Sequence, residues 1–83
     1  MINIAYGETR KISYDWTQVL ERNSATLVTT VWEYDGTATL TSPTETDGKV
    51  TVLFAPSTDG VLTNEATLSD GQVLFQQWDV YVV

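Results

Sequence analysis

Residues 61–83 carry the clearest alternation of apolar and polar positions in the chain. In residues 61–68, the apolar side chains Leu62, Ala66 and Leu68 fall on one parity, and Val73 and Phe75 share a parity with Tyr81 in residues 72–83. An Asp-Gly pair separates the two runs, and glycine adopts the positive φ of a tight turn without a Cβ clash. The pattern predicts a hairpin against which the other strands assemble.

Four more runs have the composition of strands: residues 11–16, 25–34, 37–41 and 49–54. The run 49–54 alternates cleanly, which places Val50, Val52 and Phe54 inward. Apolar side chains fall on both parities of 25–34, so we expect this strand to be central in its sheet.

Turn signals separate these runs at regular intervals. Asp-Gly occurs four times, at spacings of twelve, twelve and eleven residues. Proline should keep the polar segments 42–48 and 55–60 out of a strand ladder, and Gln76-Gln77 could form a bulge in the long last strand. The whole pattern predicts an all-β immunoglobulin-like β-sandwich of six to seven antiparallel strands, with a small barrel as the alternative.

Two segments depart from the strand pattern. Residues 16–23 space Trp16, Val19 and Leu20 as one face of a helical turn, which we expect to close one end of the sandwich with Asp15 as its N-cap. Residues 1–7 form an apolar N-terminal arm, and residues 8–83 form the sandwich domain. The arm could be an edge strand, but a tail that orders on a partner is favoured because termini fray unless tied down. Its deletion should then weaken assembly more than folding.

Length and composition limit the sources of stability. The chain has 83 residues with no cysteine and no histidine, so a disulfide or a thiolate metal site cannot add stability. A domain of this size buries only about 60% of its unfolded surface, which favours oligomerisation or docking into a larger assembly.

The charge argues against several partners. The net charge is −7, and the four basic residues form no dense patch, which disfavours nucleic acid and an anionic membrane surface. The start of the chain lacks the pattern of a signal peptide, and no apolar run approaches the ~20 residues of a membrane span.

No catalytic constellation emerges from the sequence. Without histidine or cysteine there is no histidine-based triad and no thiol nucleophile. The carboxylates Asp15, Glu33, Asp59 and Asp79 have no spacing that pairs any two for acid–base work. A calcium site needs several oxygens within one loop, and Asp47 or Asp59 alone offers too few. We therefore expect no enzyme, no metal and no cofactor.

The aromatic and apolar-arm residues are the candidates for contacts. Trp16 and Trp32 are expected in the core, whereas Trp78 could serve either the core or an interface. The candidate protein-interface residues are Ile2, Ile4, Tyr6, Tyr34, Trp78 and Tyr81.

The order of several short motifs resembles that of a known family. The motifs are Tyr14-Asp15-Trp16 followed by Leu20, Thr29-Thr30-Val31-Trp32, Thr63-Asn64-Glu65-Ala66-Thr67, Ser69-Asp70-Gly71-Gln72 and the closing Val80-Tyr81-Val82. In this order they resemble a family of small tailed-bacteriophage virion proteins, the fiber–tail adaptor or head–tail accessory proteins.

This resemblance implies a function as well as a fold. It implies an immunoglobulin-like sandwich built into the virion, on the tail or head surface, in symmetric copies that contact other tail, fiber, portal-region or capsid proteins. A capsid decoration protein is one alternative. Another is a carbohydrate- or host-surface-binding module that stacks Trp78, Tyr34 or Tyr6 on a sugar.

Overall fold

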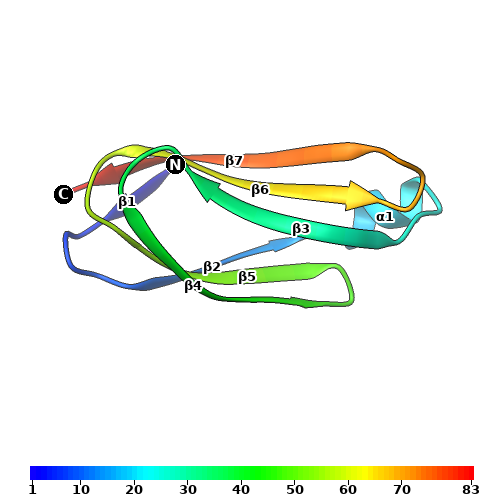
Figure 1. Cartoon of the computed structure of the whole chain (residues 1–83), viewed down its shortest axis with the longest axis horizontal. Coiled ribbons are helices and arrows are strands. Elements are labelled where there is room, and N and C mark those ends of the chain that lie inside the picture. Colours follow the sequence, from blue (N-terminus) through cyan, green and yellow to red (C-terminus); the bar gives the residue numbers. More distant parts are fainter.

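The computed structural model describes all 83 residues as an all-β sandwich (Figure 1). The elements are β1 (Ile2–Ile4), β2 (Arg10–Asp15), α1 (Thr17–Arg22), β3 (Leu27–Tyr34), β4 (Ala38–Thr46), β5 (Lys49–Pro56), β6 (Gly60–Leu68) and β7 (Val73–Val82). The molecule measures 40 × 18 × 16 Å. At one end of the long axis lies α1, and at the other lie the C-terminus and the β3–β4 and β5–β6 connections.

The seven strands form two sheets, which confirms the expected sandwich of six to seven strands. One sheet has the order β1-β7-β6-β3 and the other the order β2-β5-β4. The runs β3-β6-β7 and β2-β5-β4 follow the C-F-G and B-E-D orders of an immunoglobulin sandwich. All strand pairs are antiparallel except β1 with β7, which is parallel.

The predicted C-terminal hairpin is confirmed. β6 pairs with β7 in one unbroken register, from Gly60 opposite Val80 to Thr67 opposite Val73. The predicted bulge at Gln76-Gln77 is therefore wrong. β7 reaches its second partner without bending, because its other edge pairs with β1 at Val80–Val82.

The core lies between the sheets, where the period-two pattern placed it. One cluster consists of Ile4, Ile12, Val52, Phe54, Leu62 and Val80, and a second consists of Trp16, Val50 and Ala66. The predicted inward positions of β5 and of Leu62, Ala66 and Leu68 are all buried. Alternation identified them correctly because each of these strands has only one face against the core.

The helix closes one end of the sandwich, as predicted. Val19 and Leu20 pack against the second core cluster, in which Trp16 is buried. The N-cap position is Trp16, so the assignment of Asp15 is wrong by one residue. The Asp15 carboxylate nevertheless accepts hydrogen bonds from the Thr17 amide and hydroxyl at 2.9 and 2.6 Å.

The N-terminal arm is a strand and not a tail. β1 pairs with β7 in a register from Ile2 opposite Val80 to Ile4 opposite Val82, and the Ile4 side chain is completely buried. The arm extends beyond β1, where the Tyr6 amide donates to the carbonyl of Val83 at 3.2 Å. The alternative of an edge strand is therefore the correct one for Ile2–Ile4, because these residues complete the first core cluster.

The strand β3 lies at a sheet edge, and the prediction of a central strand is wrong. A register shift between Leu27 and Thr29 leaves Val28 exposed, and Val31 faces away from the core. Val28 and Val31 therefore meet solvent and not a second layer, whereas Leu27 packs partly buried against the second core cluster.

The expected loop at 42–48 is mostly strand. β4 pairs with β5 through Thr44, Glu45 and Thr46, and the register skips Ser42 and Pro43, where the strand bulges. Proline thus interrupts the ladder without ending the strand. The expected loop at 55–60 is shorter than predicted, because β5 continues to Pro56, which pairs with Ala38 of the edge strand β4.

Candidate protein-interaction surface

The outer face of the four-stranded sheet carries an exposed group of apolar side chains, which we call the outer-face patch: Val31, Val73, Phe75 and Tyr81. Val31 and Phe75 lie on either side of Glu65 in one row across β3, β6 and β7. Phe75 is 60% exposed, and the other three are close to half exposed. Polar side chains separate these residues, since Glu65 stands between Val31 and Phe75, and Gln77 and Asp79 lie between Phe75 and Tyr81 on the same face of β7. Exposed apolar side chains among polar ones are a feature of surfaces that bind other proteins.

The charges around the patch all have one sign. Glu33, Glu65 and Asp79 lie on the same outer face, and the four strands of this sheet contain no lysine or arginine. The one ion pair of the structure joins Arg10 to Glu8 at 2.8 Å, and the Arg10 guanidinium also donates to the carbonyl of Asn3 on β1 at 3.0 Å, so it does not pair with Glu33, Glu65 or Asp79. The carboxylates beside the patch are therefore free to meet a basic partner.

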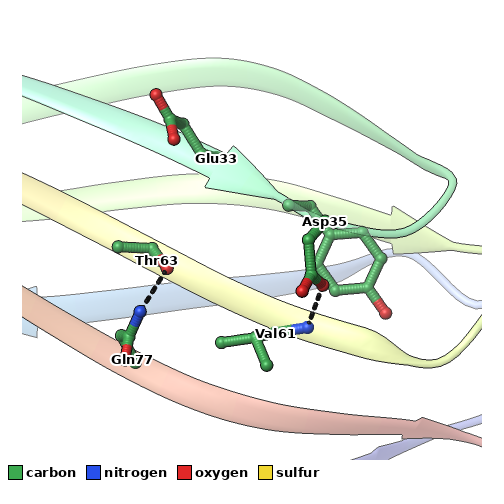
Figure 2. Close-up of a pocket in the computed structure, with 6 residues that line it drawn as sticks. Glu33, Asp35, Val61, Thr63 and Gln77 are labelled. Atoms are coloured by element: carbon green, nitrogen blue, oxygen red, sulfur yellow. Dashed lines mark hydrogen bonds between the residues drawn. The ribbon is translucent and has the colours of Figure 1, made fainter.

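A shallow hollow of about 340 Å³ adjoins the patch and contains Glu33, Tyr34, Asp35, Val61, Thr63 and Gln77 (Figure 2). The Asp35 carboxylate accepts a hydrogen bond from the Val61 amide at 2.5 Å, and the Gln77 side chain donates to Thr63 at 3.2 Å. Glu33 points away from Asp35 (Figure 2). The two carboxylates do not converge on a common point, as acid–base catalysis requires.

No cluster of three or more aspartate or glutamate side chains lies close enough together to hold a metal ion. The four acids considered from the sequence are dispersed: two accept hydrogen bonds from backbone amides, and Glu33 and Asp79 are exposed on the outer face. Asp15 accepts from Thr17, Asp59 accepts from the Val82 amide at 2.7 Å, and Asp79 is exposed on the outer face.

Two of the four Asp-Gly pairs form hairpin turns, and the other two join the sheets. Asp47-Gly48 and Asp70-Gly71 connect neighbouring strands of one sheet. Asp35-Gly36 and Asp59-Gly60 lie in the β3–β4 and β5–β6 crossovers, which pack against each other. A Cβ on Gly36 would lie 2.7 Å from the ring of Tyr34, so only glycine fits this approach.

Tyr34, at the end of β3, makes a hydrogen bond to the β5–β6 crossover. Its hydroxyl donates to the carbonyl of Thr58 at 2.5 Å, and its ring meets that of Phe54 edge to face. Burial raises the pKa of Tyr34, and the negative charges of Asp59 and Asp35 raise it further. Tyr34 thus has a structural role at this end of the molecule.

A buried side-chain amide, that of Asn64, joins three of the short motifs noted in the sequence. The indole N–H of Trp16 donates to Asn64 Oδ1 at 2.8 Å, and Asn64 Nδ2 donates to the hydroxyl of Thr30 at 2.7 Å. Asn64 is completely buried on β6 between the sheets. These residues are spaced far apart in the chain, so the network ties α1, β3 and β6 into one unit.

The structure separates the six candidate interface residues into two groups. Ile4 is completely buried, and Ile2 packs against the first cluster, so neither presents a free surface. Tyr34 makes a hydrogen bond to the β5–β6 crossover, and Trp78 stacks on Trp32 with ring centroids 5.7 Å apart. Only Tyr6 and Tyr81 are exposed.

Three residues of the patch were not among the candidates: Val31, Val73 and Phe75. Val73 and Phe75 share the parity of Tyr81, so the signal was present in the sequence. The register supplies the missing information, since Trp78 lies opposite the buried Leu62 and its parity is therefore the inward one.

Comparison with protein-family models, with curated proteins and with solved structures gave no match for this chain. None of its helical segments has the length and apolar character needed to cross a membrane.

Proposed function

We propose that the chain is a structural virion protein of a tailed bacteriophage, an adaptor or accessory subunit that joins fiber, tail or head components by protein–protein contacts. The observation that carries this proposal is the outer-face patch, whose apolar side chains lie among Glu33, Glu65 and Asp79 without a cation on the same sheet. The order of motifs that resembles the fiber–tail adaptor family supports it from the sequence. A rigid sandwich with such a face is suited to join two larger components.

The architecture agrees with the needs of a joining subunit. Hydrogen bonds join the two crossovers at Tyr34 and Asp35, and the buried Asn64 network joins β3, β6 and the residue before α1, so contacts across the sheets brace both ends of the sandwich. A rigid surface loses little conformational entropy when it binds, which favours stable docking in many copies.

Mass spectrometry of purified particles tests this proposal. Particles of the phage that encodes the chain should contain it in a constant ratio to the major capsid protein. The same ratio separates the adaptor from the capsid decoration alternative. A decoration protein is present in copy numbers set by the icosahedral lattice, whereas an adaptor is present in copy numbers set by the symmetry of the tail axis. Particles that lack the chain would contradict both.

The alternative of a carbohydrate-binding module has less support in the structure. Two of the three aromatic residues proposed to stack on a sugar, Trp78 and Tyr34, are partly buried and pack their rings against the core. Tyr6 remains exposed, but no second aromatic side chain of that set accompanies it on the surface.

A further inference from the structure

The edge of β3 is long and unprotected, and so is the part of the β7 edge before Val80, because β1 pairs with β7 only from Val80 to Val82. β1 has three residues, β2 carries Arg10 and Lys11, and β4 bulges at Ser42 and Pro43. Short length, lysine, proline and bulges are the devices that keep sheet edges from pairing with other chains. β3 is eight residues long, contains no lysine, arginine or proline, and is regular from Thr29 to Tyr34.

The free edge of β3 exposes a regular row of backbone groups. The Asp35 amide donates to the carbonyl of Val61 on β6, so the backbone groups of Val31 and Glu33 point toward β6 as well. Those of Thr30, Trp32 and Tyr34 then point away from the sheet. No amide of β3 donates to a side chain or to a loop.

An apolar slot lies directly beneath this edge, between the two sheets. It has a volume of about 280 Å³ and is lined by Thr30, Val31, Trp32, Leu40, Pro43 and Val52. Trp32 contributes the one buried side-chain polar atom without a hydrogen-bond partner, its indole Nε1. A strand added to β3 would direct every second side chain toward this slot.

The outer side of the same edge selects the charge of the added strand. Glu33 lies on β3, and Glu65 is its neighbour on β6 one row along, and neither has a cationic partner. A second copy of this chain would bring a further net charge of −7 to this face. A strand with basic outward side chains is therefore favoured over self-association.

We propose that the β3 edge binds an extended segment of a partner protein in which apolar and basic residues alternate. The segment adds a strand beside β3, places its apolar side chains over the slot and pairs its basic side chains with Glu33 and Glu65. The main-chain bonds supply affinity and the alternating side chains supply specificity, as in other cases of strand addition. This inference rests on the proposed function and names the chemistry of one partner.

A short synthetic peptide of alternating lysine and valine tests the proposal on the isolated chain. At about ten times its dissociation constant, the peptide should slow amide hydrogen exchange of Thr30 and Trp32 about tenfold, because only the free fraction exchanges. The control peptide has the same sequence with methylated backbone amides, which keeps the charge but removes the pairing. Equal binding of both peptides, or no slowing, would overturn the proposal.

Two matched variants locate the site. Val31→Lys and Val73→Lys add the same charge at positions that are both 45% exposed on the same face, but only Val31 lies on β3, whereas Val73 lies on β7 at the far side of β6. Val31→Lys should weaken peptide binding at least about tenfold, equivalent to 1.4 kcal/mol, and Val73→Lys much less. An equal effect of both variants would overturn the edge assignment.

Two further results separate this proposal from others. A concentration-dependent dimer in light scattering that Val31→Lys abolishes would assign the edge to a second copy, and would overturn the basic segment. If the chain is present in particles but the peptide does not bind, the strand-addition proposal fails and the proposed function stands. If the peptide binds but particles lack the chain, the proposed function fails and the strand-addition proposal stands.

Discussion

At the scale of single residues, the side chain of Asn64 forms two hydrogen bonds between distant parts of the chain in the interior. It is the buried polar side chain of the core, and it accepts from Trp16 and donates to Thr30. A buried donor that loses its acceptor suffers the full penalty of desolvation, which is larger than the net gain from forming the bond.

Asn64→Ala should therefore lower the free energy of unfolding by about 2–3 kcal/mol, since it leaves the Trp16 indole N–H without a partner and opens a small cavity. Urea denaturation of the variant and the parent measures the loss. Asn3→Ala, at an exposed asparagine, is the control and should change stability by less than about 0.5 kcal/mol. A loss at Asn64 as small as that of the control would contradict the network.

Tyr34 makes the stability of the fold sensitive to alkaline pH. Its pKa in the folded chain is raised by burial and by the charges of Asp59 and Asp35. Below the ordinary tyrosine pKa of about 10 the side chain is neutral in both states, and its contribution to stability is complete. Above it the unfolded chain ionises first, so the free energy of unfolding falls as the pH rises through the folded pKa.

Tyr34→Phe should remove this part of the alkaline loss while weakening the fold at neutral pH by about 1 kcal/mol through the missing bond to Thr58. Urea denaturation at about pH 9 and about pH 11 compares the two chains. Tyr6→Phe, at an exposed tyrosine outside the core, controls for the loss of a hydroxyl. If the parent and Tyr34→Phe lost equal stability between the two pH values, ionisation of the Tyr34 hydroxyl would not contribute to the pH dependence of folding.

At the scale of elements, the three residues of β1 matter more than their number indicates. Ile4 completes the first core cluster, whereas Ile2 on the same strand is only partly buried beside it. Deletion of residues 1–6 is therefore expected to destabilise the fold. The expectation that the deletion acts mainly on assembly assumed a free tail, and β1 is a paired strand.

Ile4→Ala should lower the free energy of unfolding by about 2–5 kcal/mol, the range for truncating a buried isoleucine. Ile2→Ala is the matched control on the same strand, with a smaller expected loss because its side chain is partly exposed. Denaturation followed by tryptophan fluorescence measures both. Equal and negligible losses would mean that β1 does not hold its place in the sheet.

The elements also show what alternation along a sequence can predict. It identified the inward residues of β5 and β6 because each strand has one buried parity, and it identified the β6–β7 hairpin because the turn chemistry agreed with it. It failed for β3, where Val28 is exposed by a bulge and Val31 by its position on the outer face. Which strand lies beside another is a property of the whole sheet, so β3 at the edge was not predictable from its own residues.

The candidate site was predictable only in part for the same reason. Tyr81 and its parity with Phe75 were visible in the sequence, but the choice of the outward parity depends on the pairing of Trp78 with Leu62. Aromatic residues alone do not mark a surface, since Trp78 and Tyr34 are partly buried and pack their rings against the core.

At the scale of the whole molecule, the two faces of the sandwich differ in charge. All lysine and arginine residues found on strands belong to the three-stranded sheet, namely Arg10, Lys11 and Lys49. The opposite sheet has only carboxylates beside its apolar patch. This polarity gives the molecule one face suited to a basic partner and orients it during docking.

Phe75→Ser should leave folding intact and reduce incorporation into phage particles, because Phe75 is the most exposed side chain of the patch. Its truncation removes apolar area from a contact and not from the core. Val83→Ser removes a similarly exposed apolar side chain outside the patch and is the control. Quantitative mass spectrometry of particles made with each variant measures the ratio; equal incorporation would show that the patch is not the docking face.

The most direct test of the account is carbodiimide cross-linking of purified particles, which couples carboxylates to lysines in contact with them. We predict cross-links from Glu33, Glu65 or Asp79 to lysines of another virion protein, since these three carboxylates surround the patch and have no cationic partner within the chain. Absence of the chain from the particles would contradict the proposed function, and cross-links only from carboxylates elsewhere, such as Glu21 or Glu45, would contradict the assignment of the docking face.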